Sequence, residues 1–195
     1  QFFYNKDLQK PLEDALGQLN QVVFQNELGS FGDKARRISA LAGIIAKSLG
    51  TNEAEAARAG LLAKTDLVSL MVGEFPELQG IMGSYYAKAQ GESPVIADSI
   101  LGHYLPRFSG DELPSSMTAC AVAIADRIDT LVGLFGIGQP PTGSKDPFAL
   151  RRQSLAVVRI CIEAPIDLDL MALLRTSARL HTAECETAPV MAYIL

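Results

Sequence analysis

Apolar residues recur along much of this chain at steps of three and four positions, which places them on one face of an α-helix. The first such run predicts a helix from about Lys6 to Gly29, and Pro11 lies early enough in it to be tolerated. A break at Gly32 and Asp33 precedes a second helix, which ends at Gly50. The apolar positions of these two helices are Leu8, Leu12, Leu16, Leu19 and Val23, then Ile38, Leu41, Ile45 and Leu49.

The next helix starts are marked by capping residues. Asn52, followed by Glu55 in the position of a capping box, predicts the start of a third helix. Ser93 before Pro94 predicts another start, with a helix that runs to about Tyr104. We expect the third helix to carry four leucines into the core, Leu61, Leu62, Leu67 and Leu70.

The segment from Ser115 to about Phe135 is apolar almost all round, which predicts a central buried helix. Asp126 lies within it and is costly to bury unless it is paired. Asp146 caps a further helix over about 148–163, and a last helix is predicted over about 168–183. Strand signals are nearly absent, so the predicted fold class is all-α, with about seven to nine helices.

Residues 64–92 read "KTDLVSLMVGEFPELQGIMGSYYAKAQGE" and combine a helical pattern with residues that helix interiors normally exclude. Each of Gly73, Gly80 and Gly83 costs a helix roughly 0.5–1 kcal/mol relative to alanine, and Pro76 breaks it. This pattern predicts a helix, a sharp turn and a second helix, with two backbones in close approach.

Composition narrows the possible functions. The 195 residues are 48% hydrophobic and 20% charged, with a formal net charge of −5, so any contact with nucleic acid has to be local. Three widely spaced cysteines without a CxxC pair favour reduced thiols in a cytoplasmic protein. The chain starts at Gln1 and has neither a leader nor a long apolar run, so we expect a piece of a longer protein without a membrane span.

Catalytic chemistry is not visible in the side chains. His103 and His181 lie far apart, and neither has a partner at the spacing of a metal pair, which argues against a zinc site. No phosphate-binding glycine loop follows a strand, and no nucleophile is paired with a histidine. The residues alone predict a helical domain that binds something.

Long motifs carry a family resemblance. The 64–92 segment, together with "LPSS", "ADRIDTLVGLFGIGQPPTGSKDPFALRR" and "VVRI", resembles the β subunit of bacterial-type α2β2 glycyl-tRNA synthetase. The resemblance implies that residues 1–195 form a single helical HD-like domain, with 165–195 either a linker or the start of the anticodon-binding region. It also implies a non-catalytic, tRNA-handling role beside an α subunit that charges tRNA(Gly) with glycine. ATP would be used there, and this fragment would need no cofactor.

HD-type phosphohydrolases hold a metal with histidines and aspartates, and this resemblance can be followed residue by residue. Lys34 falls where the first His would stand, Ala63 and Lys64 occupy the His-Asp positions, and Asp126 is retained. An ammonium group has no lone pair for a metal, so metal-assisted hydrolysis should be lost and no metal bound. We expect Lys64 to pair with Asp126. The alternatives are a solvated Lys64, with hydroxyls or backbone groups satisfying Asp126, and a surviving hydrolase.

Two basic clusters are candidates for contact with tRNA. Arg151, Arg152 and Arg159 share one predicted helix that Lys145 precedes, and guanidinium groups suit phosphates. Arg152 has the alternative of pairing inside the domain with Asp126 or Asp129. The second cluster consists of Lys34, Arg36 and Arg37. Either cluster has the alternative of being only a solvated face.

The glycine-rich turn is a candidate contact with a partner, either RNA or the α subunit. Glu74, Glu77, Gln79 and Tyr85 lie near it and would supply the contacting side chains. The alternative is a tight corner that is satisfied within the domain. A third function also stays open, in which the domain is a scaffold between α and β subunits and touches no RNA.

Overall fold

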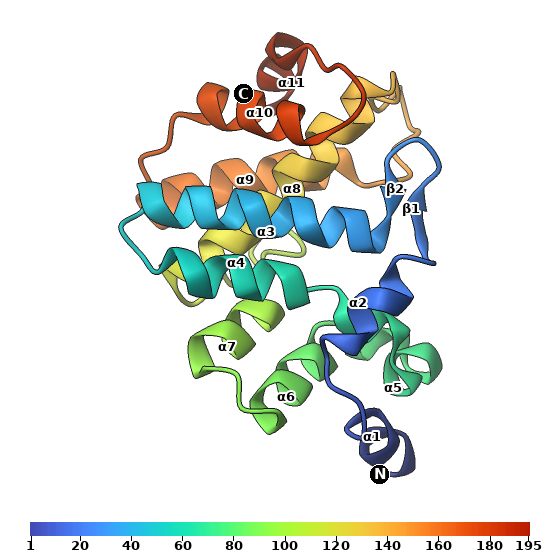
Figure 1. The fold of residues 1–195 in the computed structure, drawn as a ribbon. Coiled ribbons are helices and arrows are strands. Elements are labelled where there is room, and N and C mark those ends of the chain that lie inside the picture. Colours follow the sequence, from blue (N-terminus) through green and yellow to red (C-terminus); the bar gives the residue numbers. More distant parts are fainter.

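Eleven α-helices, two short 3-10 turns and one small hairpin make up the computed structural model, which describes residues 1–195 (Figure 1). The all-α class is confirmed, although there are more helices than predicted because several are only one or two turns long. No helix is long and apolar enough to cross a bilayer. The helices are α1 (Phe2–Asp7), α2 (Asp14–Leu19), α3 (Phe31–Ser48), α4 (Glu53–Leu62), α5 (Leu70–Glu74), α6 (Ile81–Ala89), α7 (Pro94–Gly102), α8 (Met117–Gly136), α9 (Leu150–Glu163), α10 (Leu170–Leu180) and α11 (Thr187–Ile194).

Helix α8 is the centre of the domain, as its all-round apolar sequence predicts. Ser116 caps it by accepting from the Ala119 amide, and Ile124, Ile128 and Leu131 are completely buried along it. Helices α3, α4, α7, α9 and α10 all pack against α8. In Figure 1, α3 and α4 lie side by side in front of α8, with α6 and α7 below and α10 and α11 above. A single apolar cluster therefore joins most of the chain, including residues from α10 and α11.

The predicted helix from Lys6 to Gly29 is wrong. Helices α1 and α2 are separate there, and a hairpin of β1 (Val23–Gln25) and β2 (Gly29–Ser30) follows them. The Asp7 carboxylate accepts from the amides of Leu70 and Met71 at the start of α5, at 2.9 and 3.0 Å, so long-range contacts override the local helical period.

Other boundaries also differ from the prediction. Helix α3 begins before Gly32, because Ser30 and Asp33 form a capping box around its first turn. Leu70 was expected in the core but is 42% exposed, because it lies in the first turn of the short helix α5 at the surface. The last predicted helix ends earlier than expected, as α10 at Leu180, because His181 has extended backbone there. Helix α11, which was not predicted, follows it.

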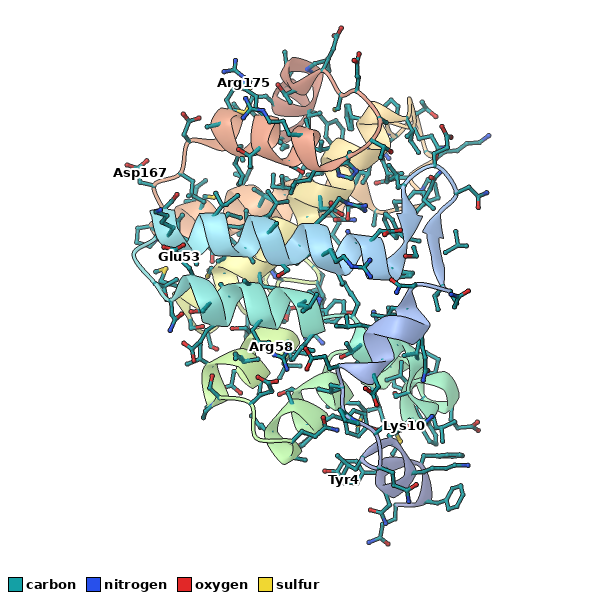
Figure 2. All side chains as sticks on the ribbon, in the orientation of Figure 1. Tyr4, Lys10, Glu53, Arg58, Asp167 and Arg175 are labelled. Atoms are coloured by element: carbon teal, nitrogen blue, oxygen red, sulfur yellow. The ribbon has the colours of Figure 1, made fainter.

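One arginine of α4 links this helix to residues that precede α2 and α7. Arg58, labelled in Figure 2, donates to Glu13 at 2.9 Å and to Glu92 at 2.6 Å. The capping starts predicted at Asn52 and Ser93 are confirmed, since their side chains accept from the amides three residues on. The local signals thus set where α4 and α7 begin, and Arg58 adds two ion pairs between α4 and its neighbours.

The glycine-rich stretch folds as predicted, into α5, a 3-10 turn over Pro76–Leu78 and α6. Two of its glycines, Gly80 and Gly83, are required within the domain. The buried carboxylate of Asp66 accepts from the amides of Gly80 at 2.6 Å and Gly83 at 2.9 Å. Gly80 has a φ of +82°, and a Cβ there would lie 2.6 Å from the Tyr104 ring. A Cβ on Gly83 would lie 2.9 Å from the Ile100 side chain. The turn thus wraps its backbone around one carboxylate.

Gly83→Ala should lower the free energy of unfolding by about 1–3 kcal/mol, because the added methyl group overpacks the site beside Asp66. Gly73→Ala is the matched control, since a Cβ at that helical position meets nothing within 4 Å. The control should be neutral or stabilising by up to about 1 kcal/mol. Urea unfolding of both variants measures the difference, and equal stability of the two would contradict the packing described here.

Candidate functional site

A pocket of about 320 Å³ opens where the first turn of α3, the segment after α7 and the start of α9 meet α8. Several aromatic rings line it, including those of Phe24, Phe148 and Tyr104. The charged residues that line it are one carboxylate and five cations, namely Asp126, Lys34, Lys64, Arg107, Arg127 and Arg152. This concentration of positive charge contrasts with the formal net charge of −5 for the whole chain.

Lys64 pairs with Asp126, which confirms the prediction. The Lys64 ammonium lies 2.8 Å from Asp126 Oδ2 and 2.9 Å from His103 Nε2. It also lies 4.2 Å from the centre of the Tyr104 ring, a cation–π distance. The Lys64 side chain is only 5% exposed and that of Asp126 14%, so the ion pair is largely shielded from solvent at the base of the pocket. The predicted alternative of a solvated Lys64 is wrong.

Lys34 occupies the other side of the same carboxylate. Its ammonium lies 3.0 Å from Asp126 Oδ1, 3.0 Å from Asp129 Oδ2 and 2.6 Å from the Thr130 hydroxyl. Three of the four positions assigned by the HD resemblance thus meet in space, namely Lys34, Lys64 and Asp126. They come from α3, from the turn that follows α4, and from α8. Ala63 is buried beside Lys64 and offers no ligand atom.

The arrangement does not fit a divalent metal. No group of three or more His, Cys, Asp or Glu side chains is arranged so that it could hold a metal ion. Both carboxylate oxygens of Asp126 face an ammonium group, which repels a cation and has no lone pair to donate. Asp126 is therefore a carboxylate that two ammonium groups neutralise, and neither of its oxygens is free to bind a metal.

Asp129, one turn after Asp126 on α8, extends the charge network and was not predicted as a site residue. It is completely buried and accepts from Arg37 Nε at 2.6 Å, while His181 Nε2 lies 3.1 Å from its Oδ1. Arg37 comes from α3, and His181 follows the last residue of α10. A second buried carboxylate on an apolar helix is the sequence signal that points to such partners.

Burial and charge act in opposite directions on the two aspartates. Burial alone would raise the pKa of Asp126, but the ammonium groups of Lys34 and Lys64 hold it well below its usual range. Burial likewise opposes ionisation of Asp129, and Lys34, His181 and Arg37 outweigh it, so the pKa of Asp129 is also lowered. Both carboxylates are therefore ionised at neutral pH and act as permanent acceptors.

His103 is held neutral beside this network. Complete burial and then the charge of Lys64 lower the pKa of His103 well below its usual value of about 6.5. Its Nδ1–H donates to the Ile100 carbonyl at 2.5 Å, which leaves Nε2 to accept from Lys64. The imidazole acts as a fixed acceptor that orients the lysine, and sequence reasoning had missed this role.

Arg127 fixes the pocket wall. Its guanidinium donates to the carbonyl oxygens of Ala123, His103 and three further residues, at distances from 2.8 to 3.2 Å. The three further acceptors are Tyr104, Leu105 and Pro106. Because these groups follow the last residue of α7, Arg127 ties that segment to α8.

The basic residues of α9 lie at the surface. Lys145, Arg151 and Arg152 are exposed, and the Arg151 guanidinium donates to the Gly143 carbonyl at 2.6 Å. Arg152 lines the pocket but pairs with neither Asp126 nor Asp129, so that alternative is wrong. Asp146 accepts from the amides of Leu150 and Arg151 and so occupies the start of the helix. Arg159 is bound to Glu163 at 2.6 Å.

The second basic cluster is divided between the interior and the surface. Lys34 and Arg37 bind the α8 carboxylates, whereas Arg36 is exposed and donates to Asn20 at 2.8 Å. Only Arg36 therefore presents its charge to solvent from this part of α3.

The residues of the glycine-rich turn are also divided. Glu74, Glu77 and Tyr85 are exposed, with Tyr85 at 57%. Gln79 instead donates to the Tyr104 hydroxyl within the domain. The turn thus contributes both to a surface and, through Tyr104, to the pocket that holds Lys64.

Comparison with known proteins identifies the family. The sequence-family model described as glycyl-tRNA synthetase beta subunit matches residues 1–195. This chain belongs to the glycyl-tRNA synthetase beta subunit family. It is 55% identical over 183 residues to the glycine–tRNA ligase beta subunit of Coxiella burnetii (strain Dugway 5J108-111), which covers 94% of this chain and 27% of the relative. It is 52% identical to that of Ectopseudomonas mendocina over the whole chain, which covers 28% of the relative.

A glycine–tRNA ligase beta subunit from Aromatoleum aromaticum is 56% identical over 177 residues, 91% of this chain and 25% of that relative. The chain thus spans little more than a quarter of the length of the curated relatives that it matches.

Lys64→Met should lower the free energy of unfolding by about 3 kcal/mol or more, because it leaves one oxygen of a buried carboxylate without its cation. Adding Asp126→Asn to this variant should restore part of the loss. Lys47→Met is the control, since Lys47 is exposed and has no ion pair. Urea unfolding provides the measurement. A Lys64→Met loss no larger than that of the control would contradict a stabilising pair.

The free energy of unfolding should fall as the pH is lowered below about 6.5. His103 then binds a proton in the unfolded protein, whereas the buried imidazole stays neutral in the folded protein. The contribution of this one group reaches at most about 1.4 kcal/mol per pH unit. His103→Gln, whose amide oxygen can still accept from Lys64, should flatten the dependence. Urea unfolding between pH 7.5 and 5.5 tests this, and parallel curves for the two proteins would exclude a buried neutral His103.

Proposed function

We propose that residues 1–195 form a non-catalytic, tRNA-handling domain of the glycyl-tRNA synthetase β subunit. The domain would support ATP-dependent charging of tRNA(Gly) with glycine by an α2β2 enzyme in the cytoplasm. ATP would be used at the α subunit, and this domain would hold no cofactor. The observation that carries the proposal is the Lys64 ammonium on Asp126, at 2.8 Å, in the pocket that the HD resemblance assigns to a metal.

The lysine pair supports the non-catalytic part of the proposal. A hydrolase of the HD type needs a metal to polarise a phosphoryl oxygen and to activate water. Here Lys34 and Lys64 neutralise the one retained aspartate from both sides. Their charges also stabilise the fold through Asp126 and Asp129, so the former site serves as a structural centre of a degenerate HD-like bundle.

The exposed cations at the start of α9 support the contact with tRNA. Three exposed cations lie close together in the chain here: Lys145, Arg151 and Arg152. None of them belongs to the buried charge network, although Arg152 lines the same pocket. Guanidinium groups bind phosphates in a forked geometry, and phosphate contacts supply most of the affinity of proteins for nucleic acids. Since Arg37 and Lys34 are bound inside the domain, the α9 cluster is the better candidate of the two predicted.

A subunit scaffold without RNA contact is the second candidate. The exposed side chains of Glu74, Glu77 and Tyr85 favour it, because they form a turn that faces solvent beside a rigid corner. Acidic residues repel RNA, so a protein partner such as the α subunit suits this turn better than tRNA does.

The double variant Arg151→Glu/Arg152→Glu in the complete α2β2 enzyme should weaken tRNA(Gly) binding about tenfold or more. The slope of log affinity against log salt should also fall by about one for each phosphate that the variant no longer neutralises. Lys47→Glu/Lys88→Glu makes the same change in charge at two exposed lysines outside α9 and is the control. Fluorescence anisotropy at two or more salt concentrations measures both quantities.

The scaffold candidate predicts a different outcome for the same variant. Binding of tRNA and its salt slope would then be unchanged, while assembly of the α and β subunits, followed by sedimentation, would weaken. An unchanged affinity for tRNA would overturn the assignment of α9 to RNA contact.

A further inference from the structure

The pocket beside Asp126 carries more positive charge than the domain itself neutralises. Three of its five cations are paired with carboxylates, namely those of Asp126, Asp129 and Asp111. Arg127 is only 7% exposed, and its guanidinium binds carbonyl oxygens alone. Arg152 is exposed where it lines the pocket and has no ion pair. An anion in this pocket would therefore meet two guanidinium groups without a counter-charge.

Aromatic rings supply much of the remaining lining. The Phe24 ring lies 5.4 Å from that of Phe31 and 6.0 Å from that of Phe148, measured between centroids. All three rings line the pocket and are half-buried. The Lys34 ammonium lies 4.7 Å from the centre of the Phe24 ring. Partly open rings beside cations suit a ligand that has both a flat apolar part and a negative charge.

The backbone of the pocket wall is strained at one residue. Ala149 lines the pocket with a φ of +53°, and it is the one residue other than glycine with a positive φ. Such a conformation persists only where the surrounding contacts impose it, and it is frequent at ligand sites. Gln153 donates to the Phe148 carbonyl at 2.8 Å across this turn. The turn brings Phe148 and Arg152 to the same pocket.

We propose that this pocket binds one nucleotide, with its base against the rings of Phe24 and Phe148 and its phosphate on the guanidinium of Arg152. A free 5′-mononucleotide and a single unpaired residue of an RNA chain present the same chemistry. Only the RNA source rests on the proposed contact with tRNA. The pocket volume of about 320 Å³ lies within the range of small-molecule sites.

The lining favours a nucleotide over a simpler anion. Unstacked bases bind proteins by packing on aromatic rings and guanidinium planes, and their phosphates bind forked guanidinium groups. Inorganic phosphate or an acidic protein side chain would use the cations and leave the rings uncovered. The Asp126 carboxylate does not exclude a phosphate, because two ammonium groups already neutralise it.

Photo-cross-linking of the complete α2β2 enzyme with 4-thiouridine 5′-monophosphate tests this inference. Mass spectrometry assigns each cross-link to a peptide, so nucleotide bound elsewhere in the enzyme is counted separately. Cross-links should map to the peptides that contain Phe24, Tyr104 or Phe148. Arg152→Gln should raise the concentration for half-maximal labelling of these peptides about tenfold, because it removes a charge-assisted contact with the phosphate. Arg36→Gln removes an exposed arginine outside the pocket and is the control.

Two further comparisons separate the parts of the ligand. Phe148→Leu keeps an apolar side chain but removes the ring, and should also weaken labelling. The nucleoside 4-thiouridine, which lacks the phosphate, should label the pocket at least about tenfold more weakly than the mononucleotide. A short single-stranded RNA with one 4-thiouridine distinguishes the sources. Labelling by this RNA alone assigns the pocket to an RNA residue, and labelling by the mononucleotide alone assigns it to a free nucleotide.

Three results would overturn the inference. They are a pocket that neither probe labels, labelling that Arg152→Gln and Phe148→Leu leave unchanged, and competition by inorganic phosphate as strong as that by uridine 5′-monophosphate. An unlabelled pocket in an enzyme whose tRNA affinity depends on Arg151 and Arg152 would leave the proposed function intact. Labelling by the mononucleotide, with tRNA affinity unchanged by the charge reversal on α9, would support the pocket and overturn the proposed function.

Discussion

The ammonium group of Lys34, shared between Asp126 and Asp129, is the interaction on which the arrangement of this domain depends. It lies 3.0 Å from a carboxylate oxygen of each aspartate and joins the start of α3 to the middle of α8. Lys64 pairs with the other oxygen of Asp126, and Arg37 and His181 contact Asp129. Because a buried carboxylate without partners is prohibitively costly, α3, the end of α4 and the end of α10 are all held to α8 by the same charges.

The same network explains the shape of the pocket. Lys64 binds the Nε2 of His103 and lies over the ring of Tyr104, and Tyr104 packs against Gly80 of the glycine-rich turn. The amides of this glycine-rich turn also bind the buried carboxylate of Asp66. Two unrelated peculiarities of the sequence, the lysine at position 64 and the glycines that follow it, therefore meet at one aromatic ring.

The sequence predicts those parts of the structure that depend on neighbouring residues. Helix α8 and the caps at Asn52 and Ser93 follow from local pattern, and the Lys64–Asp126 pair follows from the family resemblance. The end of α1 at Asp7 was missed because Asp7 is bound to residues more than sixty positions away, where periodicity has no information. His103, Asp129 and Asp66 were missed for the same reason, since their partners come from other helices.

The two lysines also bear on how such a site changes over evolutionary time. Replacing Lys64 alone by an aspartate would put two carboxylates at Asp126 with one cation between them, and replacing Lys34 alone by a histidine would remove the shared charge from Asp129. Each of these single substitutions leads through a destabilised protein. The charge arrangement therefore makes it hard to introduce metal ligands at these positions one substitution at a time.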